Sequence, residues 1–235
     1  MNRVPTEYEQ LAHAASPRGD VVLRKRRRDS AAPVIELRVN GVFVMDTAET
    51  STEEALASAA LGLVESPHRV LVGGLGLGFT LQAVLADPRV GTVTVVEIEE
   101  PVVAWMRDGT IPHGPAVLAD ERLTVVVADL ATALDEADES GPAYDLVLLD
   151  VDNGPGYLVH DHNRSLYEEP FLARVHDVLR PGGAVVVWSA APAPELMRIM
   201  EAAYGNCSEI AYDVLLHERE EQYLLYLARR VASET

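Results

Sequence analysis

Cysteine and long apolar runs are scarce in this sequence of 235 residues. The single cysteine, Cys207, excludes a disulfide bond within the chain. No apolar run approaches the roughly 20 residues that a membrane-spanning helix needs, and the first residues lack the apolar core of a signal peptide. We therefore expect a cytoplasmic protein with no membrane partner.

Positive charge is also scarce, with 19 Lys and Arg residues against 37 Asp and Glu residues and a formal net charge of −18. Such a surface repels nucleic-acid phosphates, so we expect no nucleic-acid partner, and it attracts cationic small molecules such as amines. Residues 24–28, Arg-Lys-Arg-Arg-Arg, run against this trend. They lie between two short apolar runs, and we expect them to be the exposed part of a hairpin.

The first 50 residues are expected to form an N-terminal extension followed by a small antiparallel β-unit. Residues 1–20 show no clear pattern and predict a poorly structured segment. Strand-like runs at 21–23 and 34–39 are followed by Asn40-Gly41, a strong hairpin signal, and by the returning run 42–45. This pattern predicts the antiparallel unit over residues 20–47.

A different pattern begins at Ser51, and residues 51–235 are expected to form the main domain. A helix over 51–64 is followed by apolar runs that alternate with helical stretches. The expected strands are 70–72, 93–96, 123–127, 146–149, 184–188, 208–215 and 222–229, and the later helices lie near 78–86, 100–107, 130–138, 165–179 and 194–204. This order predicts an α/β fold with a mostly parallel seven-stranded sheet and helices on both faces. Ligands bind such sheets at the carboxyl ends of the strands.

A glycine-rich turn follows the first strand of this sheet: residues 73–79 are Gly-Gly-Leu-Gly-Leu-Gly-Phe. Glycine permits a tight turn and lets a ligand approach the backbone closely. Gly74, Gly76 and Gly78 form a Gly-x-Gly-x-Gly pattern, whereas the dinucleotide fingerprint Gly-x-Gly-x-x-Gly fails at Phe79. The pattern resembles the nucleoside-binding turn of methyltransferases. The alternative is a turn that serves helix–sheet packing.

Acidic residues end the next three strands of the predicted sheet. Glu97 is placed to accept hydrogen bonds from both ribose hydroxyls, and Asp129 from an adenine amino group. Asp150 is placed near the reacting centre, where a carboxylate holds or deprotonates an attacking amine. Each acid alone is more often a helix cap or a turn residue, but three in this arrangement predict an adenosyl-binding site.

Several segments together resemble the spermidine synthase family. They are 69–78 with the glycine turn, 94–103 with Glu97, 144–150 ending at Asp150, 166–171, and the hairpin 39–43. The resemblance covers roughly residues 20–190. It implies a Rossmann-like class I methyltransferase fold beside a small N-terminal β-unit, and a homodimer. It also implies Glu97 on the ribose, Asp129 near the adenine, and Asp150 as the catalytic acid–base residue.

The sequence departs from that family at three places. The family turn reads Gly-Gly-Gly-Asp-Gly-Gly, and its Asp helps to bind the aminopropyl ammonium of decarboxylated S-adenosylmethionine; here the position is Gly76. This change removes a partner for the ammonium and a source of repulsion for the carboxylate of intact S-adenosylmethionine. The family's Tyr-Gln pair before the first long helix is Thr52-Glu53, and its second catalytic-loop Asp falls near Asn153.

The loop after the fourth strand supplies the candidate substrate-binding residues. These are Asp152, Asn153, Tyr157, His160 and Tyr167. His160 and His162 are spaced to share one metal ion, but no third ligand is evident, so we expect a polar loop without a metal. Trp188, at the end of the fifth strand, is either a core residue or a wall of the pocket.

Three hypotheses of function follow. The first is methyl transfer from S-adenosylmethionine to a small, amine-bearing acceptor, because the adenosyl site is complete but the family's acid is missing at Gly76. The second is aminopropyl transfer from decarboxylated S-adenosylmethionine to an amine, with Asp150 in the same role. The third is a non-catalytic protein that binds the nucleoside or serves as an assembly partner.

Overall fold

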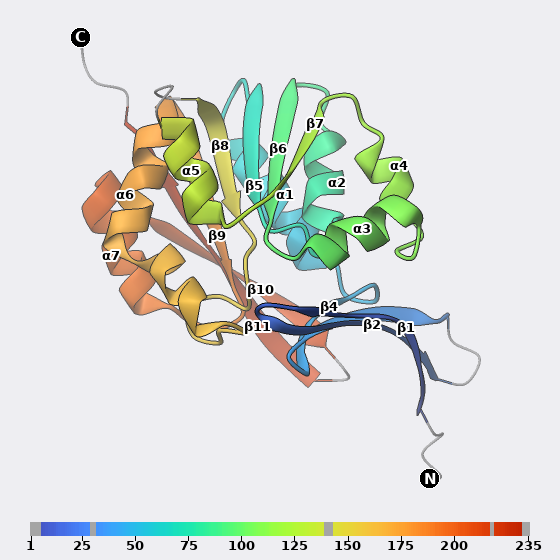
Figure 1. Cartoon of the computed structure of the whole chain (residues 1–235). Coiled ribbons are helices and arrows are strands. Elements are labelled where there is room, and N and C mark those ends of the chain that lie inside the picture. Colours follow the sequence, from blue (N-terminus) through green and yellow to red (C-terminus); the bar gives the residue numbers. More distant parts are fainter. Residues whose placement is uncertain (1–5, 29–31, 139–142, 217–218, 232–235) are drawn as a thin grey trace.

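Two β-sheets form the framework of the protein in a computed structural model, which describes residues 6–28, 32–138, 143–216 and 219–231 (Figure 1). The smaller sheet has four strands in the order β1-β2-β3-β4, and the larger one has seven. In Figure 1 the smaller sheet, in blue, lies below the larger one.

The smaller sheet is antiparallel throughout. Its strands are β1 (Thr6–Ser16), β2 (Gly19–Arg28), β3 (Val34–Val39) and β4 (Val42–Asp46). Asn40 and Gly41 join β3 to β4 with φ angles of 52° and 76°, the left-handed backbone that an Asn-Gly hairpin turn requires. The predicted antiparallel unit over residues 20–47 is therefore confirmed.

Strand β1 corrects the prediction that residues 1–20 are poorly structured; residues 1–5 lie outside the described residues. Thr6–Ser16 pairs with β2 along its whole length. Most of its side chains are exposed, so it has no clear apolar alternation, but Leu11, Ala12 and Ala14 pack against the core. The strand forms because β2 offers it a partner edge, which a local sequence pattern does not reveal.

Three residues of the basic run, Arg24, Lys25 and Arg26, are half-buried rather than exposed as predicted, whereas Arg27 is exposed. The guanidinium of Arg26 pairs with the carboxylates of Glu36 at 2.6 Å and Asp46 at 3.0 Å, and Arg24 pairs with Glu36 at 2.7 Å. Glu36 and Asp46 are almost fully buried. Buried carboxylates need such partners, so Arg24 and Arg26 stabilise the β-unit from within the sheet.

The larger sheet has the strand order β10-β11-β9-β8-β5-β6-β7. Its strands are β5 (Arg69–Gly73), β6 (Thr92–Glu97), β7 (Leu123–Val127), β8 (Tyr144–Leu149), β9 (Leu179–Ser189), β10 (Ser208–Leu216) and β11 (Arg219–Arg229). The five neighbouring strands β9, β8, β5, β6 and β7 are parallel, and β11 lies antiparallel between β9 and β10. The predicted mostly parallel seven-stranded sheet is confirmed. Its central strands are continuous apolar runs because both faces are covered.

Helices cover both faces of this sheet (Figure 1). One face carries α1 (Ser51–Leu63), α2 (Phe79–Leu85), α3 (Glu100–Asp108) and α4 (Gly114–Leu118), and the other carries α5 (Leu130–Asp138), α6 (Glu169–Val178) and α7 (Pro194–Tyr204). None of the helices in the described residues combines the length and apolarity needed to cross a membrane.

The helix predicted over 165–179 is two elements. A 3-10 helix, η1, spans Asp161–Tyr167, and α6 begins at Glu169 after Glu168 in an extended conformation. Pro170 lies in the first turn of α6, where the missing N–H of proline costs no helical hydrogen bond. The loop between β8 and η1 starts at the carboxyl end of β8 and so lies at the carboxyl edge of the sheet.

Candidate active site

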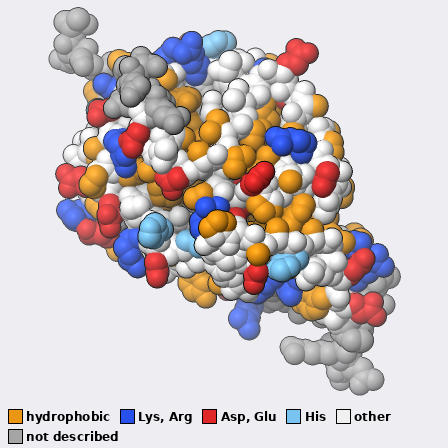
Figure 2. All heavy atoms as spheres, viewed as in Figure 1, with side chains coloured by type: hydrophobic (Ala, Val, Ile, Leu, Met, Phe, Trp, Pro, Cys, Tyr) orange, Lys and Arg blue, Asp and Glu red, His pale blue; other side chains and the backbone are white. Residues whose placement is uncertain are grey.

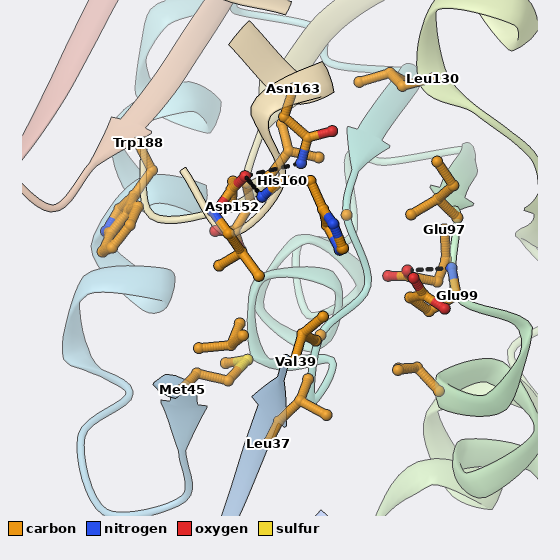
Figure 3. A pocket seen from close by; sticks show the side chains of 18 of the residues that line it. Leu37, Val39, Met45, Glu97, Glu99, Leu130, Asp152, His160, Asn163 and Trp188 are labelled. Atoms are coloured by element: carbon orange, nitrogen blue, oxygen red, sulfur yellow. Dashed lines mark hydrogen bonds between the residues drawn. The ribbon is translucent and has the colours of Figure 1, made fainter. Parts of the chain in front are cut away.

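A pocket lies between the carboxyl edge of the larger sheet and the smaller sheet (Figure 3). One side is lined by residues that follow β5, β6, β7 and β8; the opposite side is lined by residues of β3, β4 and the start of α1. The hairpin of β10 and β11 contributes Leu216 and Tyr223. Because these elements come from distant parts of the chain, the pocket depends on both sheets.

The glycine turn brings the backbone into this pocket without side chains. Gly74, Gly76 and Gly78 have φ angles of 92°, 49° and 84°, a left-handed region that favours glycine. A Cβ atom at Gly74 would lie 2.0 Å from the backbone oxygen of Asp150, so the turn is packed against the end of β8. Gly74 and Gly76 line the pocket. Gly78 caps α2 and faces Met106 instead, which favours a packing role for that residue.

Glu97 ties the turn to the end of β6. It is buried, and its carboxylate accepts hydrogen bonds from the backbone N–H groups of Leu75 at 2.9 Å and Glu99 at 2.8 Å. Burial raises the pKa of this carboxyl group, and the backbone hydrogen bonds oppose the shift. Glu97 also lines the pocket, in a fixed orientation that suits the acceptance of hydroxyl hydrogens.

Asp129 caps the start of α5 and also lines the pocket. One carboxylate oxygen accepts hydrogen bonds from the backbone N–H groups of Ala131 at 2.9 Å and Thr132 at 3.2 Å, at the start of α5. The residue also lines the pocket, beside Ala128 and Leu130. A cap that fixes the side chain at the rim is compatible with contact to an adenine ring.

Asp150 lies at the end of β8 and faces the pocket. Its Oδ2 atom accepts a hydrogen bond of 2.6 Å from the hydroxyl of Thr80 on α2. Burial raises the pKa of Asp150 to about 6, and the negative charge of Glu97 adds to this shift. The hydrogen bond from the Thr80 hydroxyl opposes it. A carboxyl group with such a pKa exchanges protons near neutral pH, as a general base must.

Glu53 is a second buried acid in the same pocket. It lies in the first turn of α1 and accepts a 3.0 Å hydrogen bond from the hydroxyl of Thr52. Burial and the charge of Asp150 raise its pKa to about 8. Within the described residues, no Arg, Lys or His forms an ion pair with Glu53 or Asp150. Two acids that share a pocket in this way favour a cationic ligand.

The loop after β8 is organised around Asp152. Its carboxylate accepts hydrogen bonds from the backbone N–H of Val159 at 2.5 Å and from the side-chain amide of Asn163 at 2.8 Å. Both Asp152 and His160 line the pocket (Figure 3), whereas His162 is exposed. The interactions of Asp152 therefore also hold the loop in its conformation.

Three of the predicted substrate-binding residues lie outside the pocket lining. The side-chain amide of Asn153 donates to the backbone oxygen of Phe43 at 3.2 Å and links the loop to β4. The hydroxyl of Tyr167 donates to the backbone oxygen of Val151 at 2.5 Å. Tyr157 is 65% exposed. Asn153 and Tyr167 therefore support the loop rather than face the pocket, and Tyr157 lies on the surface.

The chain matches the model of the spermine/spermidine synthase domain over residues 49–216. It belongs to this family. Putrescine N-methyltransferase 3 of Nicotiana tabacum is 33% identical over 178 residues, which are 72% of this chain and 44% of that protein. The polyamine aminopropyltransferase of Aeropyrum pernix is 31% identical over 179 residues, which are 71% of this chain and 54% of that protein. The chain thus spans about half the length of the curated relatives that it matches.

Solved structures of spermidine synthases share the fold. One in complex with the transition-state analogue AdoDATO has a TM-score of 0.78 and 17% identity, covering 94% of this chain and 73% of the other. Spermidine synthase from Thermotoga maritima has the same TM-score and identity, covering 94% of this chain and 72% of the other.

Further pocket residues of this family member were not singled out from the sequence as site residues. Met45, Glu53, Glu99 and Tyr223 all line the pocket. Glu53 had a usable signal, since an acid stands where the resembled family has glutamine. Met45, Glu99 and Tyr223 had none, because only the packing of separate elements brings them to the carboxyl edge.

Trp188 is both a core residue and a wall of the pocket. It is 7% exposed, belongs to the larger hydrophobic cluster and lines the pocket. Its ring meets that of Tyr223 edge to face, with centroids 4.9 Å apart. These two rings and Leu216 give the pocket an apolar surface.

The described residues contain no group of three or more His, Cys, Asp or Glu side chains placed to hold a metal ion.

Proposed function

We propose that this chain transfers a methyl group from S-adenosylmethionine to a small, amine-bearing acceptor. The observation that carries the proposal is Gly76, which lines the pocket where the resembled family has an acid. A carboxylate there favours a cofactor tail with an ammonium alone, and it opposes a tail that also carries a carboxylate. Without that acid, the turn accepts intact S-adenosylmethionine.

The pocket contains the groups that an adenosyl moiety requires. Glu97 is oriented for the ribose hydroxyls, Asp129 borders the rim for the adenine amino group, and the glycine turn permits close approach. Glu99 adds a carboxylate oxygen, Oε2, that is buried and has no hydrogen-bond partner within the described residues. A buried acceptor of this kind is costly unless a ligand donates to it, which supports a hydroxyl-bearing or amino-bearing ligand.

Asp150 and Glu53 serve the acceptor. The sulfonium of S-adenosylmethionine supplies an electrophilic methyl carbon. A cationic amine bound beside Glu53 lowers the raised pKa of this acid, so that its carboxylate compensates the charge of the amine. Asp150 accepts the proton that the attacking nitrogen loses. As the N–C bond forms, the C–S bond breaks, leaving a methylated amine and S-adenosylhomocysteine. Alignment and exclusion of water account for the remaining catalysis.

Aminopropyl transfer from decarboxylated S-adenosylmethionine is the second candidate. The chain is 31% identical to a polyamine aminopropyltransferase and 33% identical to a putrescine N-methyltransferase. The two identities support the two reactions equally. Asp150 would have the same role. The two reactions differ in the by-product, which is methylthioadenosine after aminopropyl transfer.

Mass spectrometry of the by-products separates the candidates. The purified chain is incubated with either cofactor and a panel of small amines. We expect S-adenosylhomocysteine and a methylated amine, and we expect Asp150→Asn to lower kcat by about 10² to 10⁴-fold because the proton acceptor is lost. Methylthioadenosine as the main product would contradict methyl transfer. Absence of turnover with both cofactors would favour the third hypothesis, a non-catalytic binding protein.

Assembly, location and the division at residue 50 stay predictions. We propose a homodimer, as the family resemblance implies, and light scattering of the purified chain would test it. On the face shown in Figure 2, acidic and basic side chains are interspersed. The cytoplasmic location, which fractionation of cells would test, is proposed on the sequence alone.

A further inference from the structure

Met45 fills the space in front of the glycine turn. It lies on β4, opposite Leu37 of β3, and its Sδ atom accepts a hydrogen bond of 3.1 Å from the backbone N–H of Leu77. A Cβ atom built at Gly76 would lie 2.6 Å from the same sulfur. The thioether therefore occupies the place where any side chain at position 76 would begin.

The shape of β4 brings Met45 to this place. The pairing of β3 with β4 shifts between Leu37 and Arg38, so that Arg38 pairs with Phe43 and Leu37 pairs with Met45. Val44 is thus an additional residue, as in a β-bulge, which changes the direction of the side chains that follow it. Figure 3 shows Met45 on the β4 side of the pocket, together with Leu37 and Val39 of β3.

The side chain that fits at position 76 consequently depends on the side chain at position 45. The φ angle of Gly76 is 49°, and an aspartate tolerates such a backbone better than most residues. A side chain at position 76 therefore requires the Met45 thioether to shift, and the left-handed backbone adds a strain of its own. Met45 is half-buried and lines the same pocket as Gly76 and Asp150.

We propose that Met45 is a specificity-determining residue that selects the cofactor tail. Its uncharged thioether fills the position of a carboxylate side chain and presents no charge to the tail. A tail with both an ammonium and a carboxylate meets no repulsion there, whereas a tail with an ammonium alone gains no partner. This inference rests on the proposed methyl transfer, and it extends that proposal from Gly76 to the residue that faces it.

The decisive comparison is Met45→Glu with Met45→Gln. Both side chains have nearly the length of methionine, Gly76 stays in place, and only the charge differs. Calorimetry measures the affinities of each variant for S-adenosylmethionine and for its decarboxylated form. We expect Met45→Glu to shift the affinity ratio about tenfold toward the decarboxylated form relative to Met45→Gln, as the gain of a charge-assisted contact implies.

A second pair tests the steric part and decides the matter should Met45→Glu fail to fold. Gly76→Asp alone should melt at a lower temperature and favour the decarboxylated form less than the double variant does, because its Cβ must displace the Met45 thioether. Gly76→Asp combined with Met45→Ala should fold and prefer the decarboxylated form about tenfold more than Gly76→Asn combined with Met45→Ala.

The outcomes distinguish this inference from the proposed function. Equal affinity ratios for Met45→Glu and Met45→Gln would overturn the role of Met45, and so would a well-folded Gly76→Asp that shifts the ratio as far as the double variant. Either result leaves methyl transfer standing. A wild-type chain that prefers the decarboxylated cofactor would instead contradict methyl transfer, however the variants behave.

Discussion

Thr80 positions Asp150. The threonine lies on α2, directly after the glycine turn, and is 3% exposed. Its hydroxyl has Asp150 Oδ2 as its acceptor at 2.6 Å, and this hydrogen bond favours the charged form of the acid. Thr80 thus orients Asp150 and lowers its proton affinity against the effect of burial. The hydroxyl does not have to touch the substrate to do so.

Substitution of Thr80 by valine should raise the pKa of Asp150, because the hydroxyl no longer stabilises the carboxylate. The acidic limb of the profile of kcat/KM against pH should therefore move to higher pH. Near neutral pH we expect kcat/KM to fall about tenfold, the loss of one hydrogen bond to a charged group. Thr80→Ser, which keeps the hydroxyl, is the matched control and should retain the wild-type limb. If the acidic limb of the Thr80→Val profile stays where it is in the wild type, the hydroxyl of Thr80 has no influence on the pKa of Asp150.

The hairpin of β1 and β2 contacts the cofactor side of the pocket through Arg18. The guanidinium donates to Glu99 Oε1 at 2.9 Å and to the backbone oxygen of Ile98 at 2.5 Å. These acceptors directly follow Glu97 on β6. One element of the smaller sheet therefore fixes the segment that is proposed to hold the ribose.

Arg18→Ala should weaken binding of the adenosyl cofactor about fivefold or more and lower the free energy of unfolding by about 1–3 kcal/mol, because Glu99 would stay buried without its partner. Calorimetry and urea denaturation measure the two effects. The exposed ion pair of Arg198 with Glu195 supplies the control, and Arg198→Ala should change both quantities little.

The result that contradicts this role is cofactor affinity unchanged in Arg18→Ala. The double variant Arg18→Ala with Glu99→Gln separates charge from geometry. It removes the uncompensated buried charge, so it should recover part of the lost stability without recovering cofactor affinity.

The stability of the whole molecule should depend on pH through its two pocket acids. Folding raises the pKa of Glu53 from 4.5 to about 8 and that of Asp150 from 3.8 to about 6. For an acid whose pKa is raised, the folded state holds its proton more tightly. The resulting stability is complete below the unfolded pKa and is lost as pH rises through the folded pKa.

The free energy of unfolding of the ligand-free chain should accordingly fall between about pH 5 and about pH 8.5. Glu53→Gln should reduce this fall and make the chain more stable than wild type by about 1–3 kcal/mol at the upper pH, with little difference at the lower pH. Urea denaturation at both pH values measures it. Glu54→Gln, on the exposed side of the same helical turn, is the control. A gain of equal size at both pH values would mean that charge is not the cause.

Local patterns were sufficient for most of the larger sheet and insufficient for the edges of the fold. Parallel strands buried on both faces are continuous apolar runs, so the central strands were recognisable from composition. Strand β1 was missed because its pairing with β2 supplies what its own sequence lacks. The pairing of Arg24 and Arg26 with Glu36 and Asp46 was missed because a basic run is usually solvated.

The sequence by itself determined which chemistry can lie at the carboxyl edge. Its glycine turn and the acids Glu97, Asp129 and Asp150 follow successive strands, and the ends of parallel strands meet at one edge in any sheet of this kind. Only the tertiary structure decided what faces them. Met45 reaches Gly76 and Glu53 shares the pocket with Asp150 because the smaller sheet and α1 pack against that edge. Such contacts join residues far apart in the chain, so no local pattern encodes them.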